Sequence, residues 1–242
     1  MKTLMRLEIL RMLRNRRYLI FTLAYPVAMY LIFGSQSGDV DGTDVSAYIM
    51  VSMASFGAVG ATLSAGVQRI AAERQSGWTR QLRLTTLTGR QYVISKLVSA
   101  SVVGLPAIVL VLFTGFLRGV RLDPWQWGVI VLALWFGSFV FAVLGIGLGY
   151  LVAPDSAQPM FMLVYLGMAV LGGMWVPLTG FPRFLQDIGH VMPTYRLGQL
   201  GWEVLGGHHP RVSDVLVLAG YLVAFTALAA WRYRRDEQKV AA

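Results

Sequence analysis

Residues 125–151 read WQWGVIVLALWFGSFVFAVLGIGLGYL and contain no charged side chain. A helix needs about 20 predominantly apolar residues to cross the hydrocarbon core of a bilayer, so this stretch is long enough to span a membrane. Because backbone polar groups in lipid must be satisfied within the segment, we expect the stretch to cross as a helix. It therefore places the chain among integral membrane proteins.

Other apolar segments follow the same pattern, and basic or glycine- and proline-rich turns separate them. Composition agrees, since 56% of the residues are hydrophobic and only 14% are charged. We predict an all-α polytopic membrane protein with six transmembrane helices, formed by a single domain over residues 1–242. The six predicted spans are 18–34, 45–67, 97–117, 125–151, 159–178 and 213–231.

The basic residues are distributed unevenly between the two ends of these spans. With both termini in the cytoplasm, 16 of the 21 Lys and Arg residues lie inside, and those left outside are Arg118, Arg121, Arg183, Arg196 and Arg211. This is the positive-inside asymmetry of a multi-pass protein of the bacterial cell membrane. It also accounts for the net charge of +9, so nucleic acid is not an expected partner.

The two ends of the chain are predicted to lie at the cytoplasmic surface. Residues 1–17 are expected to form an interfacial helix that contacts membrane lipids, because apolar residues recur among its arginines. A basic tail that only sets the topology is an equally good interpretation. Residues 18–232 would then form the six-helix membrane domain, and residues 233–242 a cytoplasmic tail.

Small residues recur four apart in two of the predicted spans. Such rows let helix backbones approach closely. They occur at Gly57, Ala61 and Ala65 in the second span and at Gly145 and Gly149 in the fourth. We predict that these residues pack helices, either within one subunit or between subunits.

The chain lacks the residue patterns of common catalytic and metal sites. There is no cysteine, and the His208-His209 pair has no carboxylate at ligand spacing, so we expect no metal site. No phosphate-binding loop occurs around Lys2, Lys96 or Lys239. The spans place no charged residue near mid-membrane, where ion-coupled carriers need one. We therefore predict no catalytic residue and no bound cofactor, and we expect a transporter of this kind to receive its energy from a partner.

Two regions differ from ordinary membrane sequence. The first, between the second and third spans, contains Glu73-Arg74-x-x-Gly77, then Leu82 and Thr86, then Tyr92-x-x-Ser95-Lys96. The second, before the last span, contains Gly172-Gly173-Met174-Trp175-Val176-Pro177, then Phe181-Pro182, then Pro193-x-Tyr195. With these motifs, span number and topology, the whole chain resembles the ABC-2 family of ATP-binding-cassette exporter permeases. Within the family it looks most like the permeases paired with daunorubicin-type or other antibiotic-resistance ATPases.

The resemblance implies a permease subunit that is not itself an enzyme. A separate ABC ATPase subunit would bind ATP and Mg²⁺, and a second permease copy would complete a homodimer. Residues 71–84 would form a cytoplasmic coupling helix, with Glu73, Arg74, Gly77, Trp78, Arg80 and Arg83 as the ATPase-coupling residues. The outer region would re-enter the membrane through short helices, with Gly173, Trp175, Pro177, Pro182, Pro193 and Tyr195 as its motif residues. The chain departs from the family pattern at Trp78, where a threonine is usual, and at Leu87, where a proline is common.

The expected cargo is an amphipathic small molecule, an antibiotic or a lipid-like compound, exported from the cell. The spans carry aromatic and methionine side chains that suit varied apolar shapes, although ordinary helix packing accounts for most of them. They are Tyr25, Met29, Tyr30, Phe56, Met160, Phe161, Met162 and Tyr165. Three alternatives stay open: a membrane anchor or sensor subunit, a lipid-modifying membrane enzyme, and a glycan-exporting permease of the same family.

Overall fold

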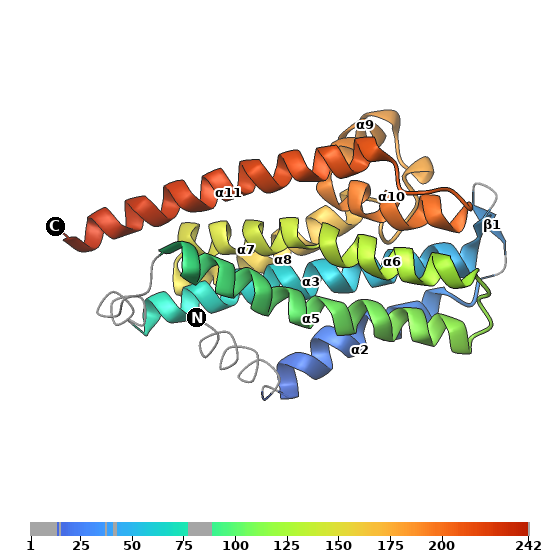
Figure 1. The fold of residues 1–242 in the computed structure, drawn as a ribbon, viewed down its shortest axis with the longest axis horizontal. Helices are drawn as coiled ribbons and strands as arrows, with labels where there is room; N and C mark the ends of the chain where they lie inside the picture. Colours follow the sequence, from blue (N-terminus) through green and yellow to red (C-terminus); the bar gives the residue numbers. More distant parts are fainter. Residues whose placement is uncertain (1–13, 15, 37, 41–42, 77–88, 242) are drawn as a thin grey trace.

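The computed structural model describes residues 14, 16–36, 38–40, 43–76 and 89–241, and Figure 1 shows a bundle of long helices. The all-α class predicted from the sequence agrees with this architecture. A two-stranded antiparallel ribbon, β1–β2, accompanies the helices. The elements are α2 (Arg16–Phe33), β1 (Asp39–Val40), β2 (Thr43–Asp44), α3 (Val45–Gln75), α5 (Gly89–Leu117), α6 (Pro124–Gly137), α7 (Phe139–Leu151), η1 (Pro154–Ser156), α8 (Ala157–Leu171), η2 (Leu178–Gly180), α9 (Arg183–Val191), α10 (Pro193–Leu205) and α11 (Val212–Ala241).

Helix α3 is the centre of the bundle. It packs against α2, α5, α7, α8 and α10, and its side chains are buried almost without interruption from Met50 to Val67. Many of these side chains are small, which allows neighbouring helices to surround α3 on every side. The helix begins at the ribbon, where the Asp44 carboxylate accepts a hydrogen bond from the Ser46 backbone N–H at 3.3 Å.

The bundle has two distinct ends (Figure 1). At one end, which we name the α3–α5 end, α3 finishes and α5 begins. At the other, which we name the α9–α10 end, lie the two short helices and the β ribbon. Helix α11 runs along the bundle from the α9–α10 end toward the α3–α5 end. The described residues of the two unusual sequence regions therefore lie at opposite ends of the molecule, and their placement on opposite sides of a membrane stays a prediction.

The length and composition of the helices support four of the six predicted spans. Within the described residues, four helices are long and apolar enough to cross a membrane, namely Val45–Gln75, Ile94–Leu117, Pro124–Leu151 and Val212–Arg232. They correspond to the second, third, fourth and sixth predicted spans. Thr22–Phe33 is apolar but shorter, and α8 comprises 15 residues. The chain is a multi-pass helical membrane protein, while the number of six spans stays a prediction.

Two predicted spans differ in detail from the helices. Helix α8 ends at Leu171, before the predicted end at residue 178, because Gly173 has a left-handed backbone with φ of 71° and Pro177 follows it. Within the fourth span the helix breaks at Ser138, whose hydroxyl donates to the Trp135 carbonyl at 2.7 Å. The break divides the span into α6 and α7.

Two predicted surface helices fall largely outside the described residues. The interfacial helix over 1–17 belongs to this group, because residues 1–13 and 15 are not described. Of the predicted coupling helix over 71–84, residues 71–75 continue α3, and residues 77–84 are not described. The short outer helices expected between the fifth and sixth spans correspond to α9 and α10.

Candidate functional site

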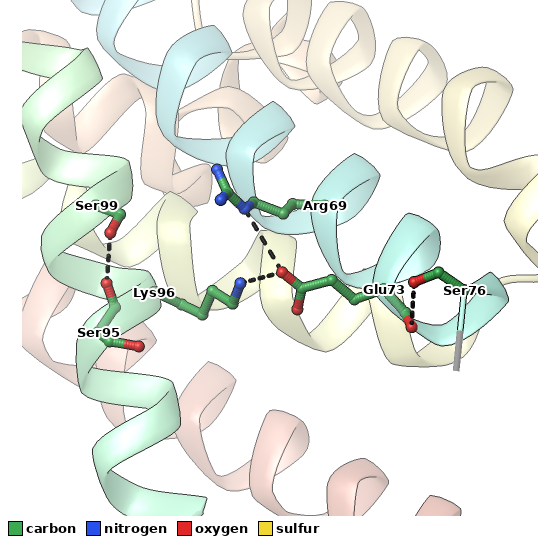
Figure 2. Close-up of polar contacts among 6 residues, drawn as sticks. All are labelled: Arg69, Glu73, Ser76, Ser95, Lys96 and Ser99. Carbon is green, nitrogen blue, oxygen red and sulfur yellow. Dashed lines mark hydrogen bonds and ion pairs between the residues drawn. The ribbon is translucent and has the colours of Figure 1, made fainter. Parts of the chain in front are cut away.

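A buried ion pair joins the end of α3 to the beginning of α5. The Lys96 ammonium donates to the Glu73 carboxylate, and the Arg69 Nε lies 3.6 Å from the same carboxylate oxygen (Figure 2). Glu73 is 6% exposed and Lys96 is 4% exposed. Figure 2 also shows the Ser99 hydroxyl donating to the Ser95 carbonyl at 2.8 Å, on the turn of α5 that carries Lys96. The ion pair therefore holds the end of α3 against the beginning of α5, the two helices that residues 77–88 connect in the sequence.

Arg74, the neighbour of Glu73, connects α3 to a third helix. Its Nη1 donates to the carbonyl oxygens of Gly149 and Val152, at 3.2 and 2.9 Å. Both carbonyls lie at the C-terminal end of α7, where the last backbone oxygens lack intrahelical partners and the helix dipole favours a cation. The Glu73-Arg74 dipeptide thus ties α3 to α5 through one side chain and to α7 through the other.

Glycines bring α3 and α7 into backbone contact beside this connection. A Cβ at Gly145 would lie 2.5 Å from the Leu63 carbonyl oxygen, and a Cβ at Gly66 would lie 2.5 Å from the Gly145 carbonyl carbon. At Gly149, a Cβ would lie 2.7 Å from the Ile70 Cβ. Only glycine allows this approach along the last turns of the two helices. We name the ion pair, the Arg74 contacts and this glycine contact together the α3–α5–α7 junction.

The junction contains some of the predicted coupling residues. Glu73 and Arg74 both contact groups of their own chain, as described above. The other four, Gly77, Trp78, Arg80 and Arg83, lie outside the described residues. The contact of all six residues with an ATPase stays a prediction. Glu73 and Arg74 come shortly before residues 77–88 in the sequence, which include the other four residues expected to make that contact.

The pairing of Lys96 with Glu73 was not predicted from the sequence. In the sequence, Lys96 stands out only as the last residue of the Tyr92-x-x-Ser95-Lys96 motif. One sequence feature pointed to it, because a lysine just inside an apolar helix needs a counter-charge. The nearest carboxylate in the sequence before it is Glu73.

A second feature is an apolar cavity of about 500 Å³ between α2, α3 and α8. Its walls include Tyr25 and Pro26 of α2, Gly57 and Gly60 of α3, and Phe161 and Tyr165 of α8. Tyr25 is 42% exposed and Met162, another lining residue, is 43% exposed, so the cavity opens at the side of the bundle.

Stacked aromatic rings form the back of this cavity. The Phe56 and Tyr165 rings are stacked with centroids 4.4 Å apart, Tyr165 stacks on Phe161 at 5.3 Å, and Tyr25 approaches Phe56 at 5.8 Å. The Tyr165 hydroxyl donates to the Phe56 carbonyl at 3.1 Å. Gly60 makes room for that contact, since a Cβ there would lie 2.6 Å from the Tyr165 hydroxyl oxygen. The hydroxyl of Tyr165 is therefore hydrogen-bonded within the protein, and its ring is part of the aromatic stack beside the cavity.

The predicted packing residues of α3 all contact other helices of the same chain. Gly57 faces α2, where its Cβ would lie 2.9 Å from the Pro26 Cγ. Ala61 and Ala65 belong to a buried cluster with Ala100 and Val103 of α5 and Ala142 of α7. With Gly145 and Gly149, these residues form contacts within one subunit.

The outer motif residues position α9 and α10 against the bundle. Trp175 lies edge-on to Phe56, with ring centroids 5.6 Å apart, so the motif reaches the aromatic stack of the cavity. Pro177 and Pro182 precede η2 and α9, and Pro193 is the first residue of α10. At the start of α10, the Thr194 hydroxyl donates to the Met168 carbonyl of α8 at 2.6 Å.

Tyr195, the last motif residue, lies in a polar cavity of about 400 Å³ at the α9–α10 end. The Gln199 amide donates to its hydroxyl at 2.6 Å, and the His190 ring lies edge-on to it at 4.9 Å. Burial raises the pKa of the Tyr195 hydroxyl above its ordinary value, so the group is a neutral phenol at physiological pH. Nearby, Arg211 pairs with Glu203 at 2.8 Å and Arg196 pairs with Asp214 at 2.6 Å.

No cluster of three or more His, Cys, Asp or Glu side chains that could hold a metal ion occurs within the described part of the chain. The described residues do form helices long and apolar enough to span a membrane, a cavity open to the side of the bundle and a charged junction between α3, α5 and α7. These features are those of a polytopic helical membrane protein.

Comparison with known proteins places the chain within this class. The model of the ABC-2 type transporter family matches residues 1–199, and the chain belongs to that family. It is 29% identical over 233 residues to a Bacillus subtilis (strain 168) protein named as the transport permease YvfS, with 95% of each chain covered. It is 28% identical over 194 residues to the linearmycin resistance permease protein LnrN of the same organism, covering 75% of this chain and 44% of that protein.

Proposed function

We propose that the chain is the membrane subunit of an ATP-driven exporter of amphipathic small molecules. In this proposal the chain crosses the bacterial cell membrane six times, with both termini and the α3–α5 end in the cytoplasm. Two copies would work with a separate ATPase, which binds ATP and Mg²⁺ and supplies the energy. The α9–α10 end would face the outside.

The observation that carries the substrate class is the apolar cavity between α2, α3 and α8. Its volume of about 500 Å³ suits a small molecule, and most of its wall is apolar. Its aromatic rings adapt to varied apolar shapes, and Met162 adds a flexible thioether. Polar side chains at Thr22, Ser64, Gln68 and Gln158 also line it, which suits a molecule with one polar part. Among the described residues that line the cavity there is no Asp, Glu, Lys or Arg, and this part of the wall does not favour a highly charged substrate.

The α3–α5–α7 junction supports the coupling part of the proposal. A force applied to the segment between α3 and α5 would reach the base of both helices, because Glu73 and Lys96 are buried together. Arg74 would pass the same displacement to α7. Since α3 also forms a wall of the apolar cavity, movement of its end is connected to the place where a substrate would bind.

The relatives support the choice of substrate class. One of them is named as a permease for linearmycin resistance, and the other as a transport permease. From the name of the linearmycin resistance permease, we infer that export of an antibiotic-like compound is the best starting hypothesis for this chain.

The test is the ATPase activity of the purified permease–ATPase complex in lipid. The panel would contain hydrophobic antibiotics, lipids and undecaprenyl-linked glycans. We expect at least one antibiotic or lipid to stimulate hydrolysis several-fold. Stimulation by the glycans alone would overturn the substrate class, and a chain that recruits no ATPase would favour the anchor or sensor alternative.

A further inference from the structure

An apolar groove of about 350 Å³ lies between α5 and α6, and it shares no lining residue with the proposed substrate cavity. It is lined by Val109, Leu112, Phe113, Phe116, Trp127 and Val131. Phe113 is 53% exposed and Phe116 is 48% exposed, so the groove opens outward. Both helices belong to membrane-spanning segments, and an outward apolar groove on them faces lipid.

The groove begins at the membrane boundary and extends inward. The apolar helix α5 ends at Leu117, directly after Phe116. Val109 lies two helical turns earlier, about 10 Å deeper along the axis at 1.5 Å per residue. Trp127, whose indole N–H donates to the Leu122 carbonyl at 3.3 Å, marks the same boundary on α6. The groove therefore has the depth at which the first part of an acyl chain lies.

The positively charged side chain of Arg121 lies beside Phe116, at the outer end of the groove. The Arg121 guanidinium carbon lies 5.3 Å from the centroid of the Phe116 ring. Arg121 is exposed, and no carboxylate of the described residues forms an ion pair with it. Arg118, three residues earlier, donates to the Leu31 carbonyl at 2.9 Å and to the Ser35 hydroxyl at 3.0 Å. Two guanidinium groups thus lie at the level where lipid phosphates are found.

We propose that the groove and Arg121 form a binding site for one anionic phospholipid, with an acyl chain in the groove and the phosphate on the guanidinium. Arginine matches phosphate because its planar guanidinium makes two parallel hydrogen bonds. An anionic headgroup such as phosphatidylglycerol suits the two cations better than phosphatidylethanolamine, whose own ammonium offsets its phosphate charge. In the proposed orientation this lipid belongs to the outer leaflet, but its binding does not depend on transport.

A second copy of the chain fits this groove less well. A helix of a second copy would place only single side chains in this groove, whereas an acyl chain can lie along its whole length. A helix would also bring no phosphate to Arg121. Charge and shape together therefore favour a lipid.

Native mass spectrometry of the delipidated full-length permease tests the proposal. Phosphatidylglycerol or phosphatidylethanolamine would be titrated in, and the Kd of the first bound lipid measured. We expect tighter binding of phosphatidylglycerol. Arg121→Gln should weaken its first binding event about fivefold or more, and so should Val109→Trp, which fills the groove. Val109 is 46% exposed, so the larger side chain should not disturb folding.

Matched controls separate the site from general effects. Arg183→Gln removes another exposed arginine at the α9–α10 end, and Leu110→Trp enlarges a neighbouring residue that is 39% exposed and does not line the groove. Neither should change the Kd.

Equal losses in the controls, no lipid preference, or an effect of only one of the two site variants would overturn the proposal. If Val109→Trp is not monodisperse by size exclusion, Val131→Trp tests the same groove. A changed oligomeric state with intact lipid binding would assign the groove to a second copy and also overturn it.

Discussion

At the scale of single residues, the Glu73 carboxylate is a buried charge that holds two helices together. It is buried at the end of a membrane-spanning helix, and Lys96 neutralises it from the next helix. Leaving either charge buried without the other is costly, whereas replacing both by apolar groups of similar size is much less so. The pair therefore acts as a specific connection between two helices.

Removal of one partner should destabilise the permease strongly. Glu73→Gln alone should cost about 3–5 kcal/mol, because it removes the carboxylate that pairs with the buried Lys96 ammonium. Lys96→Met should cost less, because Arg69 stays beside the Glu73 carboxylate. The double variant Glu73→Leu with Lys96→Met should recover most of this loss. Thermal unfolding in detergent measures all three, and additive losses in the double variant would show that the two side chains do not act as a pair.

Tyr25 offers a residue-scale test of the apolar cavity. Tyr25→Ala should lower the affinity for a stimulating compound several-fold, since a lining ring is removed. Phe33→Ala is the matched control, because Phe33 lies on the same helix, is 45% exposed and does not line the cavity. The concentration dependence of ATPase stimulation provides the measurement. Equal effects of the two variants would remove the cavity from the substrate path.

At the scale of elements, the contact of α3 with α7 depends on glycine more than on hydrophobicity. Gly66 and Gly145 bring the two backbones together, so the ends of these helices move as one unit. The connection of Arg74 to the carbonyl oxygens of Gly149 and Val152 requires this closeness.

A single methyl group should therefore disturb the contact. Gly145→Ala should destabilise the chain by about 1–3 kcal/mol, because the new Cβ would meet the Leu63 carbonyl at 2.5 Å. Gly167→Ala on α8 is the control, since a Cβ there has no neighbour within 4 Å. That variant should be neutral or stabilising by up to about 1 kcal/mol, from helix propensity. A similar melting temperature for both variants would contradict the proposed packing.

At the scale of the whole molecule, the two ends of the bundle should lie on opposite sides of the membrane. Ser76 and Gly207 are both exposed, at the α3–α5 end and the α9–α10 end respectively. The natural chain has no cysteine, so Ser76→Cys and Gly207→Cys each introduce a single label site. A membrane-impermeant maleimide added to intact cells should label only the second variant. Labelling of both from outside would reject the topology.

The coupling of transport to ATP hydrolysis is also a property of the whole complex. The sequence predicts that Arg80 and Arg83 contact the ATPase, and the combined variant Arg80→Ala with Arg83→Ala should uncouple hydrolysis from export. Interface charges removed from one side leave their partners unpaired, which weakens association. Glu73, by contrast, is buried within the permease, so its removal should lower stability before it affects the interface. Unchanged export by a well-expressed double arginine variant would contradict this placement of the coupling segment.

The sequence by itself determined the class of protein, because membrane insertion depends on local composition. Apolar runs such as residues 125–151 identify spans without any knowledge of their neighbours, and the motifs around Glu73 and Pro177 identified the family. Small residues in α3 and α7 likewise indicated close helix packing. These features could be predicted because each depends on residues that are near one another in the chain.

Only the tertiary structure decided which residues meet. The pairing of Glu73 with Lys96 and the contact of Arg74 with the end of α7 were not evident from the chain. The same holds for the groove beside Arg121 and for the cavity between α2, α3 and α8. Each of these depends on distances between groups on separate helices, and those distances follow from how the helices pack together.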